Sequence, residues 1–265
     1  MKQTPSFPPD IDISARTDGY ARFTFEGRCV VAREWAVPAI REALNNATLH
    51  EWAAGQNERD LMYGRGISYG VVLAAGTEME PSTPVVVRRN RHGGLLRFLT
   101  GEYFLMPTRA PFELSASLRL AAAGVPTPEL VAYAIYPALG VFARSDVMTR
   151  RLPSGADFPA AWSKASKTDR ELMLAAVAGL LKSLAGAGAW HADLNLKNIY
   201  IAGKDSALTP YLLDVDRVTF SGSNDEAARN FNRLARSVRK WREQRGLDFG
   251  EEALARLKSL ALENV

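Results

Sequence analysis

The sequence is poor in cysteine and in long apolar segments. Cys29 is the single cysteine among 265 residues, so a disulfide framework is excluded and a reducing compartment is favoured. The longest apolar stretch, residues 130–143, is shorter than the about 18 residues that a helical bilayer span requires, and Pro137 and Gly140 interrupt it. The first residues lack the apolar centre of a signal peptide, and we expect residues 1–18, which are polar and proline-rich, to form a flexible tail.

The charge is unevenly distributed along the chain. Hydrophobic residues make up 47% and charged residues 23% of the sequence, which is ordinary for a globular protein, and the net charge is only +4. Residues 81–101, however, contain four arginines and no acid, and residues 229–245 contain six arginines and a lysine against one glutamate. These basic segments predict an anionic partner such as phosphate, an acidic sugar or a membrane surface. A nucleic acid fits less well, because the segments lack interleaved aromatic residues and any recognisable binding motif.

The first half of the chain reads mainly as strands. Short β-branched runs, a glycine-rich turn and a proline-containing turn predict strands on both sides of a single helix that ends at Gly124. The expected strands lie in residues 62–76, 83–90 and 129–152, and the expected helix in residues 110–124. We therefore expect residues 19–150 to form an antiparallel sheet with one helix inserted.

The second half reads mainly as helices. Residues 168–190 predict a helix in which Thr168 is the N-cap and Glu171 completes a capping box. Residues 210–220 predict a short strand that ends in acids, and residues 225–246 and 251–264 predict two amphipathic helices. The chain is thus expected to be α+β, with residues 151–265 as a mainly helical second lobe and a ligand cleft between the lobes.

A polar segment, HADLNLKN at residues 191–198, interrupts the apolar texture of this second half. Asp193 and Asn198 lie in it, and Asp214 and Asp216 follow at the end of the next expected strand. All four side chains offer oxygen atoms, which suit hard cations such as Mg²⁺. If the two segments are neighbours, Asp193 can accept a proton while Asn198 and Asp214 hold metal ions. This is the arrangement that phosphoryl transfer requires.

The spacing His191, Asp193 and Asn198, followed by Asp214 after a strand, resembles the catalytic and metal-binding loops of the protein-kinase-like fold. This resemblance implies a two-lobed kinase fold that uses ATP and Mg²⁺. It also implies that Asp193 is the catalytic base, and that Asn198 and Asp214 are metal ligands. Asp216, two residues further on, is a further candidate metal ligand.

The same resemblance implies nucleotide-binding residues in the first half. Gly64 and Gly66 correspond to the loop over the phosphates. Arg88 occupies the strand position where protein kinases carry a phosphate-binding lysine, and Glu113 lies where the partner glutamate belongs. An arginine can still grip phosphate, and it can do so with two parallel hydrogen bonds. Asn195 and Asp216 also depart from the protein-kinase pattern, and no activation segment of normal length follows Asp216, which argues against a protein substrate.

A closer resemblance covers roughly residues 60–240. The segments "GRGISYG", "VVRRNRHGGLLRFLTGEYF", "FELSASLRLAAAGVPTPELVA", "HADLNLKNIYI", "YLLDVDR" and "NFNRLARSVRK" together resemble the lipopolysaccharide kinase family. Within it they are most similar to kinases of 3-deoxy-D-manno-octulosonic acid (Kdo). This resemblance implies ATP-dependent phosphorylation of the Kdo 4-hydroxyl on Kdo-lipid A, an anionic glycolipid. It further implies peripheral attachment to the cytoplasmic, anionic face of the inner membrane.

Several alternatives remain open at the level of sequence. The acceptor can be a heptose, a small alcohol or an aminoglycoside, or the chain can be a nucleotide-binding membrane-surface module without catalysis. His191 is more typical of a structural histidine, Asp216 of a metal ligand or a strand-end cap, and Gly64 and Gly66 alone of a hairpin turn. The basic face of residues 229–245 either is solvated or rests on a membrane. The oligomeric state is not indicated.

Overall fold

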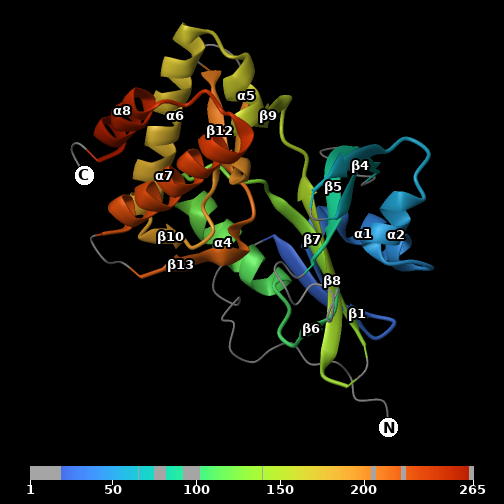
Figure 1. Cartoon of the computed structure of the whole chain (residues 1–265). Coiled ribbons are helices and arrows are strands. Elements are labelled where there is room, and N and C mark those ends of the chain that lie inside the picture. Colours follow the sequence, from blue (N-terminus) through green and yellow to red (C-terminus); the bar gives the residue numbers. More distant parts are fainter. Residues whose placement is uncertain are drawn as a thin grey trace. The chain divides into compact units, whose positions relative to one another are not determined.

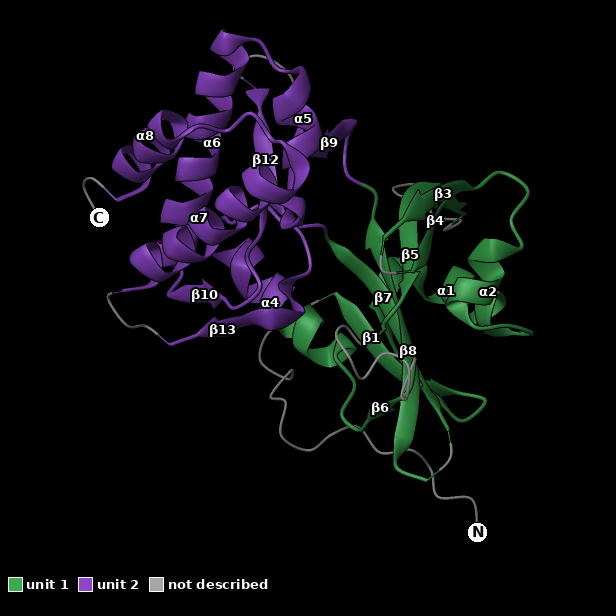
Figure 2. Cartoon of the chain, in the orientation of Figure 1, with its two compact units in different colours: residues 1–115, 129–151 green, residues 116–128, 152–265 purple. Residues whose placement is uncertain are grey.

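The computed structural model describes residues 19–64, 66–74, 82–91, 102–138, 140–203, 207–221 and 225–262 (Figure 1). The expected tail at residues 1–18 and most of the RHGGLLRFLTG segment lie outside these residues. The chain divides into two compact units (Figure 2). Unit 1 comprises Met1–Ser115 and Glu129–Arg151, and unit 2 comprises Ala116–Pro128 and Leu152–Val265.

Unit 1 is built on an antiparallel sheet. Among the described residues, eight strands pair in the order β1-β2-β7-β8-β5-β4-β3, with β6 added beside β8. The β-branched run at β5 alternates between faces, and Val85 and Val87 are fully buried. The strands are β1 (Tyr20–Phe25), β2 (Arg28–Arg33), β3 (Asp60–Tyr63), β4 (Ile67–Leu73), β5 (Thr83–Arg89), β6 (Phe104–Leu105), β7 (Leu130–Pro137) and β8 (Phe142–Arg150). The α+β class and the antiparallel sheet are confirmed.

The expectation of a single helix in this part of the chain is wrong. A 3-10 turn, η1 (Glu34–Ala36), leads into α1 (Val37–Leu44), and α2 (Leu49–Ala54) follows. Thr48 and Glu51 form a capping box at the start of α2, which satisfies backbone donors there. Buried residues of both helices, including Ile40, Leu44 and Leu49, join Val30, Val71 and Val85 of the sheet in one hydrophobic core.

The helix expected in residues 110–124 is α4 (Ala110–Ala122), and it passes from unit 1 into unit 2. It ends as predicted, since Gly124 adopts a positive φ of 74° that L-residues with a side chain avoid. Its unit 1 part carries Glu113, and its unit 2 part contributes Ala116 and Leu120 to the core there.

Among its described residues, unit 2 combines four complete helices and the second half of α4 with short strands. The 3-10 turn η2 leads directly into a strand, and η4 lies between two strands. The elements are β9 (Gly155–Asp157), α5 (Phe158–Lys164), α6 (Lys167–Gly186), β10 (Ala189–His191), η2 (Leu196–Asn198), β11 (Ile199–Ala202), β12 (Thr209–Leu212), η4 (Val215–Arg217), β13 (Val218–Phe220), α7 (Glu226–Arg245) and α8 (Glu251–Leu262). The prediction of Thr168 as N-cap is wrong: Ser166 caps α6 and forms the capping box with Asp169.

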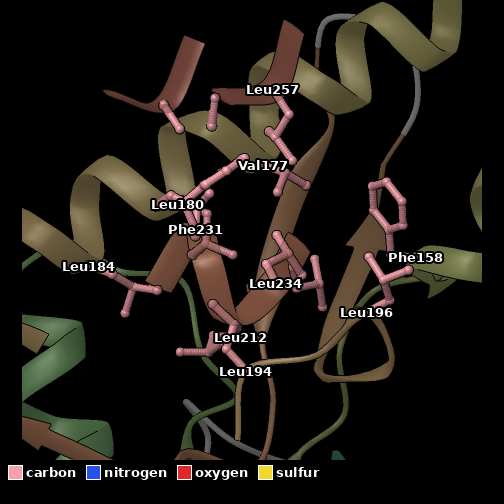
Figure 3. Close-up of a cluster of buried hydrophobic side chains, with 14 of the residues drawn as sticks. Phe158, Val177, Leu180, Leu184, Leu194, Leu196, Leu212, Phe231, Leu234 and Leu257 are labelled. Carbon is pink, nitrogen blue, oxygen red and sulfur yellow. The ribbon is translucent and has the colours of Figure 1, made fainter. Parts of the chain in front are cut away.

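A large hydrophobic core lies inside unit 2 (Figure 3). The apolar stripe expected on α7 faces it, because Phe231, Leu234 and Val238 are buried and Trp241 packs against it. Leucines from α6, α8 and β12 complete this core, so the loop between β10 and β11 is attached to a rigid body. Every described helix is too short or too polar to serve as a transmembrane span.

Candidate active site

The loop that joins β10 to β11 carries the central candidate residues, and its own leucines anchor it. Leu194 and Leu196 are buried in the core of unit 2 (Figure 3). Asp193, which precedes Leu194, and Asn195, which lies between the two leucines, remain partly accessible. The Asp193 side chain is 41% exposed. The buried leucines thus anchor the loop in the core of unit 2, while the Asp193 carboxylate stays partly exposed to solvent.

His191 supports this loop from inside. Its imidazole is fully buried; Nδ1 accepts a hydrogen bond from the Asp193 backbone N–H at 3.2 Å, and Nε2 faces the Leu213 carbonyl oxygen at 3.5 Å. Burial lowers the pKa of His191, against the opposing effects of the Leu213 carbonyl and of three nearby aspartates. The ring is therefore neutral with its proton on Nε2, and it acts as a positioning group.

Asn198 connects the loop to the next candidate carboxylate. Its side-chain Nδ2 donates to the Asp193 backbone carbonyl at 3.1 Å. The backbone carbonyl of Asn198 accepts from the Leu213 N–H at 2.8 Å. Asp214 follows Leu213 directly and adopts a left-handed conformation, with φ 53° and ψ 50°, which aspartate tolerates better than most residues. Asp193, Asn198 and Asp214 are thus brought into one corner of unit 2.

Asp216 lies close to the same corner, on the short turn η4. It is partly buried, and the Ala192 N–H donates to the carbonyl of the next residue, Arg217, at 3.2 Å. Asp193, Asp214 and Asp216 all lie near enough to His191 for their charges to oppose, in part, the lowering of its pKa by burial. The segment at 191–198 and the acids after β12 are therefore neighbours, as the sequence hypothesis required.

The donor atoms at this corner fit magnesium. Asn198 directs its amide nitrogen to the loop, so its Oδ1 is the atom left for a cation, and Asp214 and Asp216 add carboxylate oxygens. Within the described residues no group of three or more His, Cys, Asp or Glu side chains is arranged as a metal site. Mg²⁺ is usually held by one or two carboxylates together with phosphate oxygens and water, so this partial donor set suits a metal that arrives with a nucleotide.

Helix α7 holds the loop along its whole length, a role that was not predicted from the sequence. Asn230 Oδ1 accepts from the His191 N–H at 3.0 Å, and Asn230 Nδ2 donates to the Ala189 carbonyl at 2.8 Å. Arg233 Nη2 pairs with Asp193 Oδ1 at 2.8 Å, and Ser237 Oγ accepts from the Leu196 N–H at 3.1 Å. The spacing of these residues, three and then four, places them on one helix face, and this polar stripe was the signal available in the sequence.

Arg88 and Glu113 meet inside unit 1. Arg88 Nη2 forms an ion pair with Glu113 Oε1, and Arg88 Nη1 donates to Asn90 Oδ1 at 2.8 Å. Glu113 is only 4% exposed, whereas the Arg88 side chain is 27% exposed. A nearly buried carboxylate thus holds a guanidinium that remains partly open, which suits an anion-binding arginine.

The glycine-rich segment is a hairpin turn between β3 and β4. The Gly64 N–H donates to the Gly66 carbonyl at 3.1 Å, and Tyr63 pairs with Ile67 across the turn. A side chain at Gly66 would meet Arg91, whose Cδ lies 3.1 Å from the place of a Cβ. Since Ser68 of β4 pairs with Arg88 of β5, the turn lies one strand away from the candidate phosphate-binding arginine.

Comparisons with known proteins point in one direction. The profile of the lipopolysaccharide kinase (Kdo/WaaP) family matches residues 80–258. A 3-deoxy-D-manno-octulosonic acid kinase of Haemophilus influenzae (strain ATCC 51907 / DSM 11121 / KW20 / Rd) is 27% identical over 201 residues, covering 74% of this chain and 81% of that protein. Its namesake from Vibrio parahaemolyticus serotype O3:K6 (strain RIMD 2210633) is 28% identical over 181 residues, covering 67% and 71%. A solved structure, "WaaP in complex with acyl carrier protein", has a similar fold, with a TM-score of 0.52 at 16% identity over 88% of each chain.

Proposed function

The chain belongs to the lipopolysaccharide kinase (Kdo/WaaP) family, and because it is a kinase of this family we propose that it transfers phosphate from ATP to a sugar hydroxyl of lipopolysaccharide. The proposed acceptor is the 4-hydroxyl of Kdo on Kdo-lipid A. Relatives named as Kdo kinases align with two thirds or more of the chain, which supports this acceptor over a heptose.

We propose a protein-kinase-like two-lobed organisation, with residues 19–150 as the N-lobe and residues 151–265 as the C-lobe. The order of elements supports it. A glycine-rich hairpin precedes the strand of Arg88, the helix of Glu113 comes next, and the loop of Asp193 follows in unit 2. The similarity of fold to WaaP agrees with this assignment.

The observation that carries the proposed chemistry is the environment of Asp193. Arg233 holds Oδ1, and no described residue donates a hydrogen bond to Oδ2, so this second oxygen is available to an acceptor hydroxyl. The acceptor oxygen forms the new bond to phosphorus while its proton passes to Asp193 Oδ2, and ADP leaves. Asn198, Asp214 and Asp216 would hold Mg²⁺, which neutralises charge on the phosphate oxygens when bound.

The proposed role of unit 1 is to hold the nucleotide phosphates. Arg88, fixed by Glu113 and Asn90, offers a guanidinium whose planar donors match phosphate oxygens. The turn at Gly64 and Gly66 has no side chains at these two positions and the Gly64 N–H is used within the turn, so its proposed contribution is the close approach of glycine backbone to the phosphates.

We also propose that the protein works at the anionic, cytoplasmic face of the inner membrane, where a lipid-linked acceptor would lie. Side chains at one end of the sheet in unit 1 support this. Leu105 of β6 pairs with Phe142 of β8, next to Val141 and Tyr103, and these side chains are 40–63% exposed. The arginines of α7 support it less, because Arg233 and Arg242 are engaged in ion pairs.

The decisive experiment is transfer of label from γ-labelled ATP to Kdo-lipid A, with and without Mg²⁺, beside a heptose-bearing core acceptor. We expect Mg²⁺-dependent label on the Kdo acceptor alone. Asp193→Asn should reduce transfer at least about a thousandfold, since it removes the proton acceptor while keeping the side-chain shape. Asp248→Asn, a change at an exposed surface ion pair with Arg170, is the matched control and should leave transfer unchanged.

Each departure from this result has a distinct meaning. Label on the heptose acceptor would keep the phosphotransfer and overturn the substrate. Near wild-type transfer by Asp193→Asn would overturn the assignment of the base.

A further inference from the structure

We infer that Arg233 of α7 is the residue that positions Asp193 for catalysis, by fixing one carboxylate oxygen and leaving the other for the acceptor. This inference rests on the proposed function, since it concerns the orientation of the proposed base. It assigns a catalytic task to a helix whose arginines the sequence pattern had suggested as a solvated or membrane-facing surface.

The contact itself is specific. Arg233 Nη2 lies 2.8 Å from Asp193 Oδ1, the distance of a charge-assisted hydrogen bond. The other carboxylate oxygen of Asp193 receives no hydrogen bond from the described residues. An ion pair to a single oxygen defines the rotation of the carboxylate and therefore the direction in which Oδ2 presents its lone pairs.

Arg233 projects from a rigid support. The next two residues, Leu234 and Ala235, are buried in the core of unit 2, and Asn230 and Ser237 bind the backbone of the same loop on either side. The base therefore has its orientation defined relative to a 20-residue helix rather than by its own loop alone.

The polar residues nearest to Asp193 in the loop are committed to other partners. Asn195 donates from Nδ2 to the Asp193 carbonyl and accepts at Oδ1 from the Lys197 N–H, so its amide is used locally. The Lys197 ammonium pairs with Asp157 at 2.7 Å. The cation that contacts the Asp193 carboxylate is thus supplied by α7, forty residues further along the chain.

Stability alone gives a poor reason for this pair. The side chains of Arg233 and Asp193 are 33% and 41% exposed, and pairs at such exposure contribute little to folding. Folding stability therefore does not account for this pair, and its position beside a candidate base points to a role in catalysis.

The test compares three variants at saturating Kdo-lipid A with varied ATP. Arg233→Met, which keeps the apolar stem but removes the charge, is expected to lower kcat about a hundredfold with the KM for ATP unchanged. Arg233→Lys should recover only part of this loss and leave kcat about tenfold below the wild type, because an ammonium can still donate to Oδ1 but lacks the planar fork of the guanidinium. Arg236→Met, on the same helix and exposed, makes no ion pair with the described residues and serves as the matched control.

A double-mutant comparison separates positioning from direct contact with phosphate. If Arg233 acts through Asp193, then Arg233→Met should change the residual rate of Asp193→Asn less than about twofold. The inference would be overturned if Arg233→Met lowered kcat by the same factor in the wild-type protein and in Asp193→Asn. It would also be overturned if Arg233→Met raised only the KM for ATP, or if its kcat equalled that of the wild type.

The variants also separate this inference from the proposed function. A wild-type rate in Asp193→Asn would instead overturn the assignment of Asp193 as the base, and no label on the Kdo acceptor with the wild-type protein would show that the proposed function has failed. If Arg233→Met does not fold, Arg233→Lys decides: an unchanged thermal transition with kcat lowered about tenfold supports positioning, and an unchanged kcat contradicts it.

Discussion

At the scale of single residues, His191 links the stability of the site to pH. Burial lowers its pKa below the value of about 6.5 in an unfolded chain. The unfolded chain therefore binds a proton that the folded chain does not bind between these two pKa values. The contribution of neutral His191 to the free energy of unfolding is fully present above about pH 6.5. It is lost as the pH falls from there through the lower, folded-state pKa.

We predict that His191→Gln removes this part of the acid sensitivity. Glutamine is neutral throughout, so the free energy of unfolding of the variant should fall less steeply than that of the wild type as the pH is lowered from about 6.5. At pH 7.5 the variant should be less stable, because the contacts of the ring with the Asp193 N–H and the Leu213 carbonyl are lost. Urea denaturation over this pH range measures both effects, and parallel curves for the two proteins would contradict the prediction.

The candidate residues differ in how far the sequence could identify them. Asp193 and Asn198 lie five residues apart in one loop, and local spacing of this kind is visible without a structure. Arg233 is not visible in this way, because its contact with Asp193 spans forty residues and depends on the register of α7 against the loop. Arginine on a helix is usually solvated, so residue type alone pointed to the surface.

At the scale of elements, α7 is the support of the loop, and Asn230 is its central contact. Its amide is fully buried and satisfies both the His191 N–H and the Ala189 carbonyl. We predict that Asn230→Ala lowers the free energy of unfolding by about 2–5 kcal/mol, since two buried backbone groups lose their partner. Activity should fall as well, because the loop that carries Asp193 loses its attachment.

Asn232→Ala is the matched control for this prediction, since Asn232 is exposed on the same helix. Its effect on stability should be within about 0.5 kcal/mol. Chemical denaturation followed by circular dichroism compares the variants. Equal stabilities of the two would show that α7 does not hold the loop through Asn230.

Long elements are predictable from sequence where short ones are not. Helix α7 shows an apolar stripe over several turns, and its core-facing residues are those the periodicity indicates. Helices α1 and α2 have only eight and six residues and were not predicted, although the apolar stripe of α1, with Ile40 and Leu44 four residues apart, and the capping pair Thr48 and Glu51 were readable. The error of two residues at the start of α6 arose because Ser166 and Thr168 are both acceptable caps, each with an acid three residues later, and the structure shows the capping box at Ser166 and Asp169.

At the scale of the whole molecule, the class of fold follows from the sequence but the strand order does not. Strands separated by short turns, such as β7 and β8, pair as expected. Strand β2 pairs with β7, so Cys29 lies opposite Ile135, about a hundred residues away in the chain. Such pairing depends on which apolar faces meet in the core, and periodicity within one strand does not specify its neighbour.

The exposed apolar end of the sheet in unit 1 leads to a prediction about membrane binding. Residues 103–112 and 137–144 contain no acid, and Arg109 and Arg144 lie among them. The Arg144 guanidinium lies 5.8 Å from the Tyr103 ring centroid, so a cation borders the apolar side chains. Apolar side chains bordered by arginine fit an anionic bilayer, whose lipids attract the cations while the side chains enter the interface.

We predict that the protein co-sediments with vesicles of phosphatidylglycerol and phosphatidylcholine, and that replacing Leu105 and Val141 together by serine weakens binding about tenfold. Both side chains are 63% exposed, so the fold should be retained. Val72→Ser, which removes a 53% exposed side chain from β4, is the matched control and should bind as the wild type does. Equal binding by all three proteins would exclude this surface. A dimer of the wild type that the double variant abolishes would assign the surface to self-association, because apolar area that is exposed in a monomer then has a protein partner.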